Sequence, residues 1–381
     1  MSARGHRRGR RERGAVAVTA VLGLLVLLGI GALAVDLGMV VAARTQLGTA
    51  ADAAALAGAK ELAFGARLAQ ARAVEYGALN RVLGDPVVLD PGTSNAGDVV
   101  LGFYDFGDRS FRPTGTLPNA VEVTARRAGG RGTGLPTYFA AVFGRHSLDA
   151  SAQSIAVGLN RTVVVAMDVS GSMGAVIPCG HPGHPAIVPA RAAAANFLED
   201  LAASTLPERA GILAYAGGIR GQVPIAGLHD AGQPGILVGW TRALEAAPCG
   251  HEGGTNTGLA LQTAIAMFQA AGPGGADLEQ QMIVLLSDGL ANRGRHGEDL
   301  YHHEADRRNP AWRYAVEEAA DARERNITVH TISLGEDEHQ VAQMQEIAEA
   351  GGGMPLVAPR PEDLDRMFET LARAVRVALV D

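Results

Sequence analysis

The sequence predicts an α/β protein with an N-terminal transmembrane helix, a small β-rich middle region and a C-terminal domain built on a mostly parallel sheet. Three observations predict it. An uncharged apolar run spans Ala15–Val35, short β-branched runs follow from residue 85, and strand and helix patterns alternate after Arg161. The predicted divisions are a basic arm, the membrane helix, an Ala-rich helical stalk, the β-rich region and the C-terminal domain, at residues 1–14, 15–35, 36–84, 85–158 and 159–381.

The apolar run has the length of a membrane span. Ala15–Val35 contains no charged residue, and at ~1.5 Å per residue it would cover roughly the 30 Å hydrocarbon core of a bilayer. Six arginines and one glutamate precede it in residues 1–14. The positive-inside rule then places the N-terminus in the cytoplasm and the rest of the chain outside. A cleaved signal peptide is the alternative, but the run exceeds the ~7–15 apolar residues of such a signal.

Charge argues against nucleic acid as a partner. The chain has a net charge of −7, although its first 14 residues are strongly basic. The part that follows the apolar run is therefore acidic, and an acidic domain repels phosphate backbones.

The region after the apolar run is predicted as helix first and strands later. Leu37–Leu83 is rich in alanine with few helix breakers, and its small side chains allow close approach of neighbouring backbones. Asp90-Pro91-Gly92 ends this region. Short β-branched segments at 98–106, 120–126 and 147–157, separated by turn residues, predict a small β-rich domain.

From Arg161 the pattern is that of a parallel sheet covered by helices. The segments RTVVVAMD and QMIVLLSDG contain the unbroken apolar runs VVVAM and MIVLL, as in strands buried on both faces. Helical patterns lie between the strands, and a last one is predicted over Pro361–Val377. Ligands of such sheets bind at the carboxyl ends of the strands.

Five oxygen-bearing side chains lie where such strand ends are expected. Asp168, Ser170 and Ser172 follow the first strand in DVSGSM, Thr255 begins a helix in GGTNTG, and Asp288 follows a later strand. Hard oxygen donors without His or Cys suit Mg²⁺, or Ca²⁺ or Mn²⁺. Thr257 could exchange roles with Thr255, although helix capping is its expected role.

This set resembles the metal-ion-dependent adhesion site of von Willebrand factor type A domains and integrin I domains, a Rossmann-like family. The resemblance covers residues 161–377, and all five positions of the motif are matched. It implies that the two Ser and the Thr coordinate the ion directly, while one or both Asp act through water. An ion held mainly by neutral hydroxyls keeps a positive charge and can accept an Asp or Glu carboxylate from a protein partner.

The N-terminal part resembles the TadG-like family of tight-adherence (Flp) pilus assembly proteins. The resemblance covers residues 10–157, and its most specific pieces are AADAAALAGA and PNAVEVTARR. It implies an anchor in the bacterial inner (cytoplasmic) membrane and a pilus or envelope component as the partner. The alternative is an adhesion or scaffold protein that is unrelated to pili.

Cysteine and histidine allow two further interpretations. Cys179 and Cys249 flank the predicted metal loops, and an even cysteine count outside the cytoplasm predicts a disulfide between them. Both cysteines, with nearby histidines, could instead hold zinc in a hydrolase, although the spacing fits no known zinc motif; the candidate ligands are Cys179, His181, His184, Cys249 and His251. No triad, carboxylate pair or phosphate loop is recognisable, so we expect no catalysis. A further alternative is a cytoplasmic A domain that assists an ATPase, as in metal chelatases. The apolar segment Ala15–Val35 argues against it.

Overall fold

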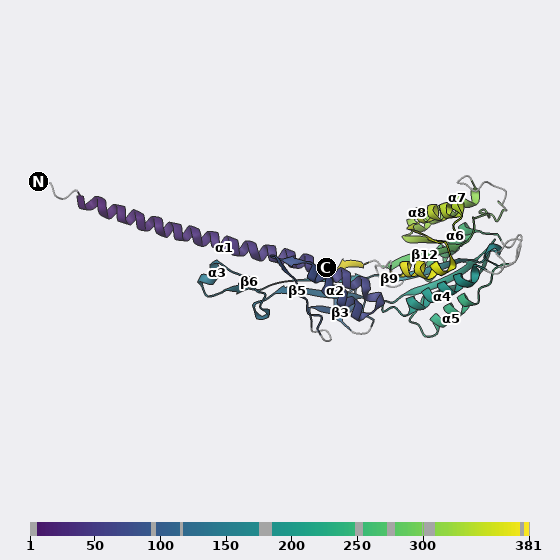
Figure 1. The fold of residues 1–381 in the computed structure, drawn as a ribbon, viewed down its shortest axis with the longest axis horizontal. Coiled ribbons are helices and arrows are strands. Elements are labelled where there is room, and N and C mark those ends of the chain that lie inside the picture. Colours follow the sequence, from purple (N-terminus) through teal and green to yellow (C-terminus); the bar gives the residue numbers. More distant parts are fainter. Residues whose placement is uncertain are drawn as a thin grey trace.

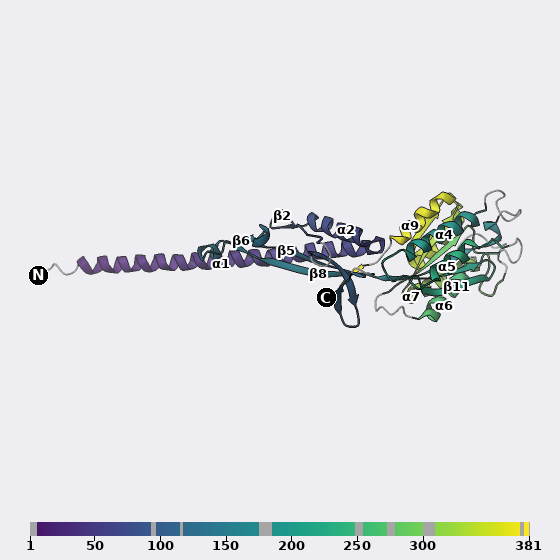
Figure 2. The same cartoon turned by 90° about the horizontal axis from the view of Figure 1, so that it is seen from below.

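The computed structural model describes residues 6–92, 97–114, 117–174, 185–247, 254–272, 279–298, 300, 309–373 and 377–380. The molecule is elongated, with a long N-terminal helix at one end and a helix-covered sheet at the other (Figures 1 and 2). A second sheet lies between them, against the later part of the long helix. The predicted fold class is confirmed: an apolar N-terminal helix, a β-rich region and a C-terminal α/β domain follow one another along the chain.

Helix α1 (His6–Glu61) has an exposed half and a buried half. By length and composition it contains a segment, starting at Val16, that could cross a membrane. The large side chains of this first half are exposed, for example Leu27 at 67% and Val41 at 62%. From Ala43 onward the small residues of the same helix are buried against the middle sheet. Exposed residues give way to buried ones within α1 because small side chains replace large branched ones, and this lets the middle sheet pack closely against the helix.

The middle unit packs a helical hairpin on an antiparallel sheet. After α1, a short 3-10 turn (Leu62–Phe64) and Gly65, whose φ of 116° favours glycine, reverse the chain into α2 (Ala66–Leu79). The sheet has the order β15-β8-β5-β3-β4. Its strands are β3 (Val99–Asp105), β4 (Ser110–Pro113), β5 (Ala120–Arg127), β8 (Ala150–Gly158) and β15 (Val377–Val380).

Smaller elements complete the middle unit. Strands β1 (Arg81–Val82) and β2 (Asp85–Pro86) form a hairpin after α2. Between β5 and β8 the chain makes an excursion through a 3-10 turn, β6, α3 and β7, at Gly129–Arg131, Leu135–Pro136, Phe139–Val142 and Ser147–Leu148.

The C-terminal sheet has the order β11-β10-β9-β12-β13-β14, and only the β10–β11 pair is antiparallel. Its strands are β9 (Asn160–Asp168), β10 (Arg209–Tyr215), β11 (Ile219–Gly227), β12 (Glu279–Ser287), β13 (Ile327–Leu334) and β14 (Gly352–Ala358). The strand β9 is buried along nearly its whole length, as its unbroken apolar sequence predicts.

Helices cover both faces of this sheet. One face packs against α4 (Ile187–Ala202), α5 (Gln233–Arg242) and α9 (Leu364–Ala372). The other packs against α6 (Thr257–Ala271), α7 (Pro310–Glu324) and α8 (Glu338–Ala350). Odd-numbered residues of β9 face the first layer and even-numbered residues the second, because side chains alternate along a strand.

Packing differs from the predicted divisions in two places. The stalk assigned to 36–84 is not one continuous helix: it folds back at Gly65 and shares a core with the strands of the 85–158 region. The C-terminal end assigned to the 159–381 domain returns to the middle sheet, since β15 pairs with β8. The final helix ends at Ala372 instead of Val377. The four apolar residues 377–380 suit a strand, and they extend the middle sheet by pairing along β8.

The two units meet at a short connection. The strand β8 ends at Gly158 and β9 begins at Asn160, so the chain passes directly from one sheet to the other. Leu206, in the loop before β10, is fully buried in the core of the middle unit. The hydroxyl of Thr205 donates to the carbonyl oxygen of Leu62.

Candidate metal centre

Asp168 is the last residue of β9, and its side chain is fully buried. The backbone N–H of Ser170 donates to its Oδ1 at 2.7 Å. The hydroxyl of Ser287, at the end of the neighbouring strand β12, donates to its Oδ2 at 2.5 Å. Both oxygens therefore have a donor, and the carboxylate is fixed at the carboxyl edge of the sheet.

Two serine hydroxyls extend this site toward Asp288. A 3-10 turn (Gly171–Met173) follows β9 and brings the Oγ atoms of Ser170 and Ser172 to 3.0 Å from each other. The Ser172 hydroxyl donates to Oδ1 of Asp288 at 2.7 Å. Four of the predicted residues are therefore connected by hydrogen bonds.

Thr255 approaches the same place from the start of α6. It is 3% exposed, and its backbone N–H donates to Oδ1 of Asn292 at 2.8 Å. Its carbonyl oxygen accepts from the N–H of Asn292 at 3.0 Å. These bonds fix the Thr255 backbone against the loop that follows Asp288.

The helix cap is not the residue that the sequence predicted. Asn256 caps α6, and its side chain accepts from the N–H of Leu259 at 3.1 Å. Thr257 is instead the first residue of the helix, and its hydroxyl hydrogen-bonds to Tyr215. Asparagine is at least as good a helix cap as threonine, so the sequence pattern did not exclude Asn256 as the cap.

Gly289 leaves space between the hydroxyls. A Cβ atom at this position would lie 3.6 Å from Oγ of Ser172 and 3.9 Å from Oγ1 of Thr255. The two hydroxyls thus face one small space that any side chain at position 289 would enter. This cradle, lined by oxygen atoms, has the character that a small cation requires.

Burial disfavours ionisation of both carboxylates. Burial, with a contribution from the charge of Asp288, raises the pKa of Asp168 to about 7. Burial raises the pKa of Asp288 to about 6. A cation between such groups favours their ionised forms, because it supplies the missing opposite charge.

The donor set fits a hard divalent ion. It combines two carboxylates with three neutral hydroxyls and contains no sulfur or imidazole. In the described part of the chain no group of three or more His, Cys, Asp or Glu side chains could hold a metal. A site here therefore depends on Ser170, Ser172 and Thr255 as much as on the carboxylates.

Two supporting residues were not singled out from the sequence. Ser287 bridges the site, because its hydroxyl contacts both Asp168 and the carbonyl oxygen of Gly289, the latter at 3.0 Å. Asn292 holds the Thr255 backbone. Ser287 directly precedes Asp288 at the end of a buried strand, a position that could have indicated its role. Asn292 gives no comparable signal.

The predicted disulfide and the zinc alternative fall outside the described residues. Cys179 and Cys249 both lie there, and so do the histidines at 181, 184 and 251. The predicted pairing therefore stays a prediction.

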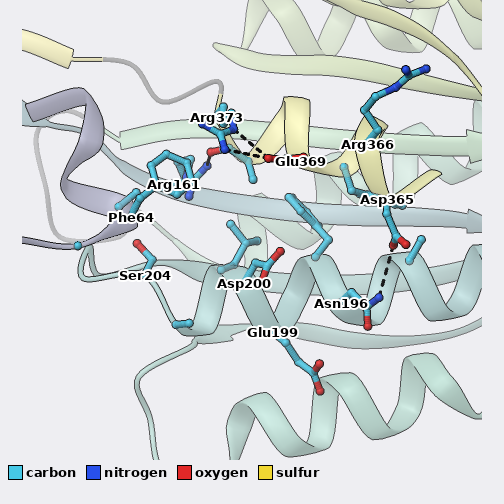
Figure 3. Close-up of a pocket in the computed structure, with 18 of the residues that line it drawn as sticks. Phe64, Arg161, Asn196, Glu199, Asp200, Ser204, Asp365, Arg366, Glu369 and Arg373 are labelled. Carbon is cyan, nitrogen blue, oxygen red and sulfur yellow. Dashed lines mark hydrogen bonds and ion pairs between the residues drawn. The ribbon is translucent and has the colours of Figure 1, made fainter. Parts of the chain in front are cut away.

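A separate cavity lies at the junction of the two units, at the opposite end of β9 from Asp168. Its volume is about 960 Å³, and it is lined by residues from the turn after α1 and from α4 and α9. Figure 3 shows Phe64 beside Arg373, whose guanidinium carbon lies 5.3 Å from the Phe64 ring centroid. Burial and three neighbouring carboxylates raise the pKa of Asp200. The cavity contains none of the five predicted residues.

Two segments of the chain match known protein families. Residues 14–61 match the Flp pilus-assembly TadE/G-like family. Residues 163–290 match the von Willebrand factor type A domain family. A search among curated proteins found no match.

Several solved structures are similar to parts of this chain at low identity. The von Willebrand factor domain of the type V pili tip protein Mfa5 from Porphyromonas gingivalis is 17% identical, with a TM-score of 0.43; the match covers 57% of this chain and 95% of that chain. The pilus adhesin SpaC from Lactobacillus rhamnosus GG is 17% identical, with a TM-score of 0.46, over 76% of this chain and 35% of that chain. An aerotolerance-related membrane protein from Bacteroides fragilis is 17% identical, with a TM-score of 0.37, over 56% and 98%.

The family match at residues 163–290 and the mostly parallel sheet make the C-terminal part similar to von Willebrand factor type A domains. The N-terminal match adds the second component. The chain combines a TadE/G-like N-terminal segment with this domain, in agreement with both sequence resemblances.

Proposed function

We propose that this protein is a membrane-anchored, metal-dependent protein-binding component of Flp pilus assembly or anchoring, and that it performs no catalysis. The observation that carries the proposal is the meeting of Ser170, Ser172 and Asp288 at one sheet edge, with Thr255 beside them. The TadE/G-like match supports the pilus context.

The chemistry of the site favours binding over catalysis. Asp168, Ser170, Ser172, Thr255 and Asp288 would hold Mg²⁺, or Ca²⁺ or Mn²⁺. The ion would supply an electrophilic position for an oxygen ligand. Because three of the five donors are neutral hydroxyls, an ion that contacts one or both carboxylates only through water would keep part of its positive charge. A partner's Asp or Glu carboxylate would complete the neutralisation.

The arrangement of the chain supports an extracytoplasmic binding domain. Leu27 and its neighbours in the first half of α1 are exposed and apolar, which suits a bilayer of the bacterial inner (cytoplasmic) membrane. The arginines before this segment favour a cytoplasmic N-terminus. The von Willebrand factor domain then lies outside, at the end of the molecule farthest from the N-terminus (Figure 1).

Metal dependence is tested with the full-length chain in detergent. We expect Mg²⁺ to bind in calorimetry and to be required for co-purification of a pilus component after crosslinking in cells that express the Flp machinery. Asp168→Ala should abolish both. Co-purification that persists in chelator and in Asp168→Ala would contradict metal-dependent binding.

Topology and pilus context need separate measurements. Protease added to intact spheroplasts should digest the C-terminal domain if it lies outside, and should leave it intact if it is cytoplasmic. An adhesion role unrelated to pili predicts that the metal-dependent partner is found equally in cells lacking the Flp machinery.

A further inference from the structure

An exposed aromatic cluster lies on the short excursion between β5 and β8. Within it, Tyr138 is 62% exposed, Val142 79% and Phe143 72%. The chain is poor in aromatics, which make up 4% of its residues, yet Tyr138, Phe139 and Phe143 fall within six positions. We call residues 137–145 the aromatic tip. Such concentrated exposure is costly in water, so the tip requires a partner.

The tip is attached to α1 by one carboxylate. Oδ1 of Asp36 accepts the backbone N–H of Tyr138 at 2.8 Å, and its Oδ2 accepts those of Phe139 and Ala140 at 2.9 and 3.0 Å. Asp36 itself is 4% exposed, whereas its neighbours Val35 and Leu37 are 50% and 57% exposed. The carboxylate is thus covered by the tip in the middle of an otherwise apolar surface.

The tip lies beside the apolar segment of α1. A Cβ atom on Gly29 would be 3.4 Å from Cε2 of Phe139, and Gly29 lies well inside the uncharged run Ala15–Val35. Along a helix, the distance from Asp36 back to Gly29 is about 10 Å. Elements that lie in a membrane interface sink ~5–10 Å into it. The distance from Asp36 to Gly29, over which the tip follows α1, is comparable to this depth.

Three features favour lipid over a protein partner. The apolar surface of the tip is continuous with that of the segment that could cross the membrane. Tyrosine and tryptophan concentrate at the level of lipid headgroups, where their rings contact both apolar and polar groups, and Tyr138 has this character. Arg145 and His146, both exposed, follow directly and can face lipid phosphates.

We infer that the aromatic tip is a second membrane-contacting element, which inserts Tyr138, Val142 and Phe143 into the bilayer interface beside α1. This inference depends on the proposed membrane anchoring. A single helix can tilt and rotate, whereas two contacts fix the orientation of the middle unit. The tip is the end of that unit nearest the N-terminus, so the C-terminal domain is directed away from the membrane (Figures 1 and 2).

The test uses tryptophan and brominated lipid. Full-length protein carrying Phe143→Trp is reconstituted into phosphatidylethanolamine–phosphatidylglycerol vesicles, with and without bromine on the acyl chains. The two native tryptophans, Trp240 and Trp312, lie in the C-terminal unit and provide a background that is subtracted with the parent protein. We expect brominated lipid to remove most of the emission of the added indole.

Two matched variants make the result decisive. Val88→Trp places the probe at a site that is also 72% exposed, on the same unit. Five residues before Val88, the N–H of Leu83 donates to Gln46 at 2.8 Å. Gln46 is about 15 Å farther along α1 than Asp36, so this part of the unit lies farther from the proposed membrane surface. This probe should not be quenched. Leu28→Trp, on the apolar part of α1, should be quenched if the helix crosses the bilayer.

Each outcome separates the two proposals. Quenching of Leu28→Trp but not of Phe143→Trp would overturn the aromatic tip and leave the anchor intact. Absence of quenching at Leu28→Trp would overturn both. A blue-shifted but unquenched Phe143→Trp would show that protein covers the tip, for example a second copy of the chain. Equal quenching of Val88→Trp would show that the whole unit lies on the membrane without a specific tip.

Discussion

The hydroxyl of Ser172 donates to Oδ1 of Asp288 at 2.7 Å, across 116 positions of sequence. The two residues follow β9 and β12, which are adjacent parallel strands of the same sheet. Their contact exists because both strands end at the same edge, so the loops that follow them must meet. A change on either side of this contact should therefore alter the proposed metal site before it alters the fold.

Asp168→Asn should remove stabilisation by Mg²⁺. The substitution keeps the shape of the side chain but removes the charge that favours a cation. A ligand present at 100 times its Kd stabilises a protein by about 2.7 kcal/mol, and this increment should disappear. Thermal unfolding with Mg²⁺ and with chelator measures it. The control is Asp337→Asn, which weakens only the cap of α8, where Asp337 accepts from Gln340, and should keep the Mg²⁺ increment.

Gly289→Ala should weaken metal binding without unfolding the domain. The added methyl group would lie at ordinary contact distances from Ser172 and Thr255, so the fold tolerates it. It would occupy the space that both hydroxyls face. We expect calorimetry to show a fall in Mg²⁺ affinity of about tenfold or more, equivalent to ~1.4 kcal/mol, with an unchanged melting temperature in chelator. Unchanged affinity would show that the ion does not use this space.

The metal-free protein should lose stability as pH rises from about 4 to about 7. Burial raises the pKa of Asp168 from 3.8 to about 7, so between these values the folded state holds a proton that the unfolded state has released. Raising the pH then favours unfolding, by an amount on the order of a few kcal/mol, and the effect levels off above pH 7. Asp288 adds to the slope up to about pH 6.

Tryptophan fluorescence in chelator can follow this dependence, because both tryptophans lie in the C-terminal unit. Asp168→Asn should flatten the slope, since its amide does not titrate. Mg²⁺ should stabilise the parent protein more at pH 8 than at pH 5, because ionised carboxylates hold the ion. A metal-free protein whose stability increases between pH 5 and pH 7 would contradict the assigned direction.

Glu208→Gln should strongly destabilise the junction between the two units. Nη2 of Arg161 lies 2.7 Å from Oε1 of Glu208, and the two side chains are 2% and 0% exposed. Nη1 of Arg161 also donates to the carbonyl oxygen of Ala372, at the end of α9, at 2.6 Å. Removing one charge leaves the other buried, which costs about 3–5 kcal/mol. Urea unfolding followed by tryptophan fluorescence measures the loss.

The double variant Arg161→Met/Glu208→Leu is the matched control for this pair. Replacing both charges with apolar groups leaves no uncompensated charge, so it should recover much of the lost stability. If the double variant is as unstable as Glu208→Gln, the cost comes from packing and not from charge.

Asp36→Ala should release the aromatic tip from α1. It removes the acceptor of three backbone N–H groups, and loss of a comparable helix cap costs about 1 kcal/mol. Trypsin should then cleave faster after the exposed Arg145 in detergent-solubilised protein. In the control, Asp149→Ala, the lost carboxylate accepts one backbone N–H among the described residues, that of Gly129 at 2.8 Å, and the effect should be smaller.

The sequence predicted the C-terminal fold better than the middle unit, for a physical reason. Strands such as β9 have an unbroken apolar run in the middle because both faces are covered, and that pattern is visible without any partner. Pairing between distant segments leaves no such pattern. The last helix was predicted to run as far as Val377, and only the contact with β8 makes Val377–Val380 a strand. The reversal at Gly65 was equally hidden, since one glycine in a helical pattern has several uses.

For the site, residues with a chemical signature were easier to predict than those that support them. Asp168, Ser172 and Asp288 could be selected because they follow buried strands and bear oxygen. The contribution of Asn292 depends on one amide oxygen reaching the N–H of Thr255, a relation of two loops that only coordinates can show. The ligand roles of the five residues stay a prediction until a metal is measured.

Strands β8 and β15 both join the middle sheet to the C-terminal domain at the same end, which affects how the protein would respond to mechanical tension. The chain enters the C-terminal domain through β8 and leaves it toward β15, where Val377 pairs with Gly158. The site at Asp168 lies at the far end of β9, about 26 Å from this connection. Tension between a captured partner and the membrane would therefore run along these strands. Hydrogen bonds between β8 and its other neighbour, β5, lie across that direction, so they would be sheared together instead of being broken one at a time.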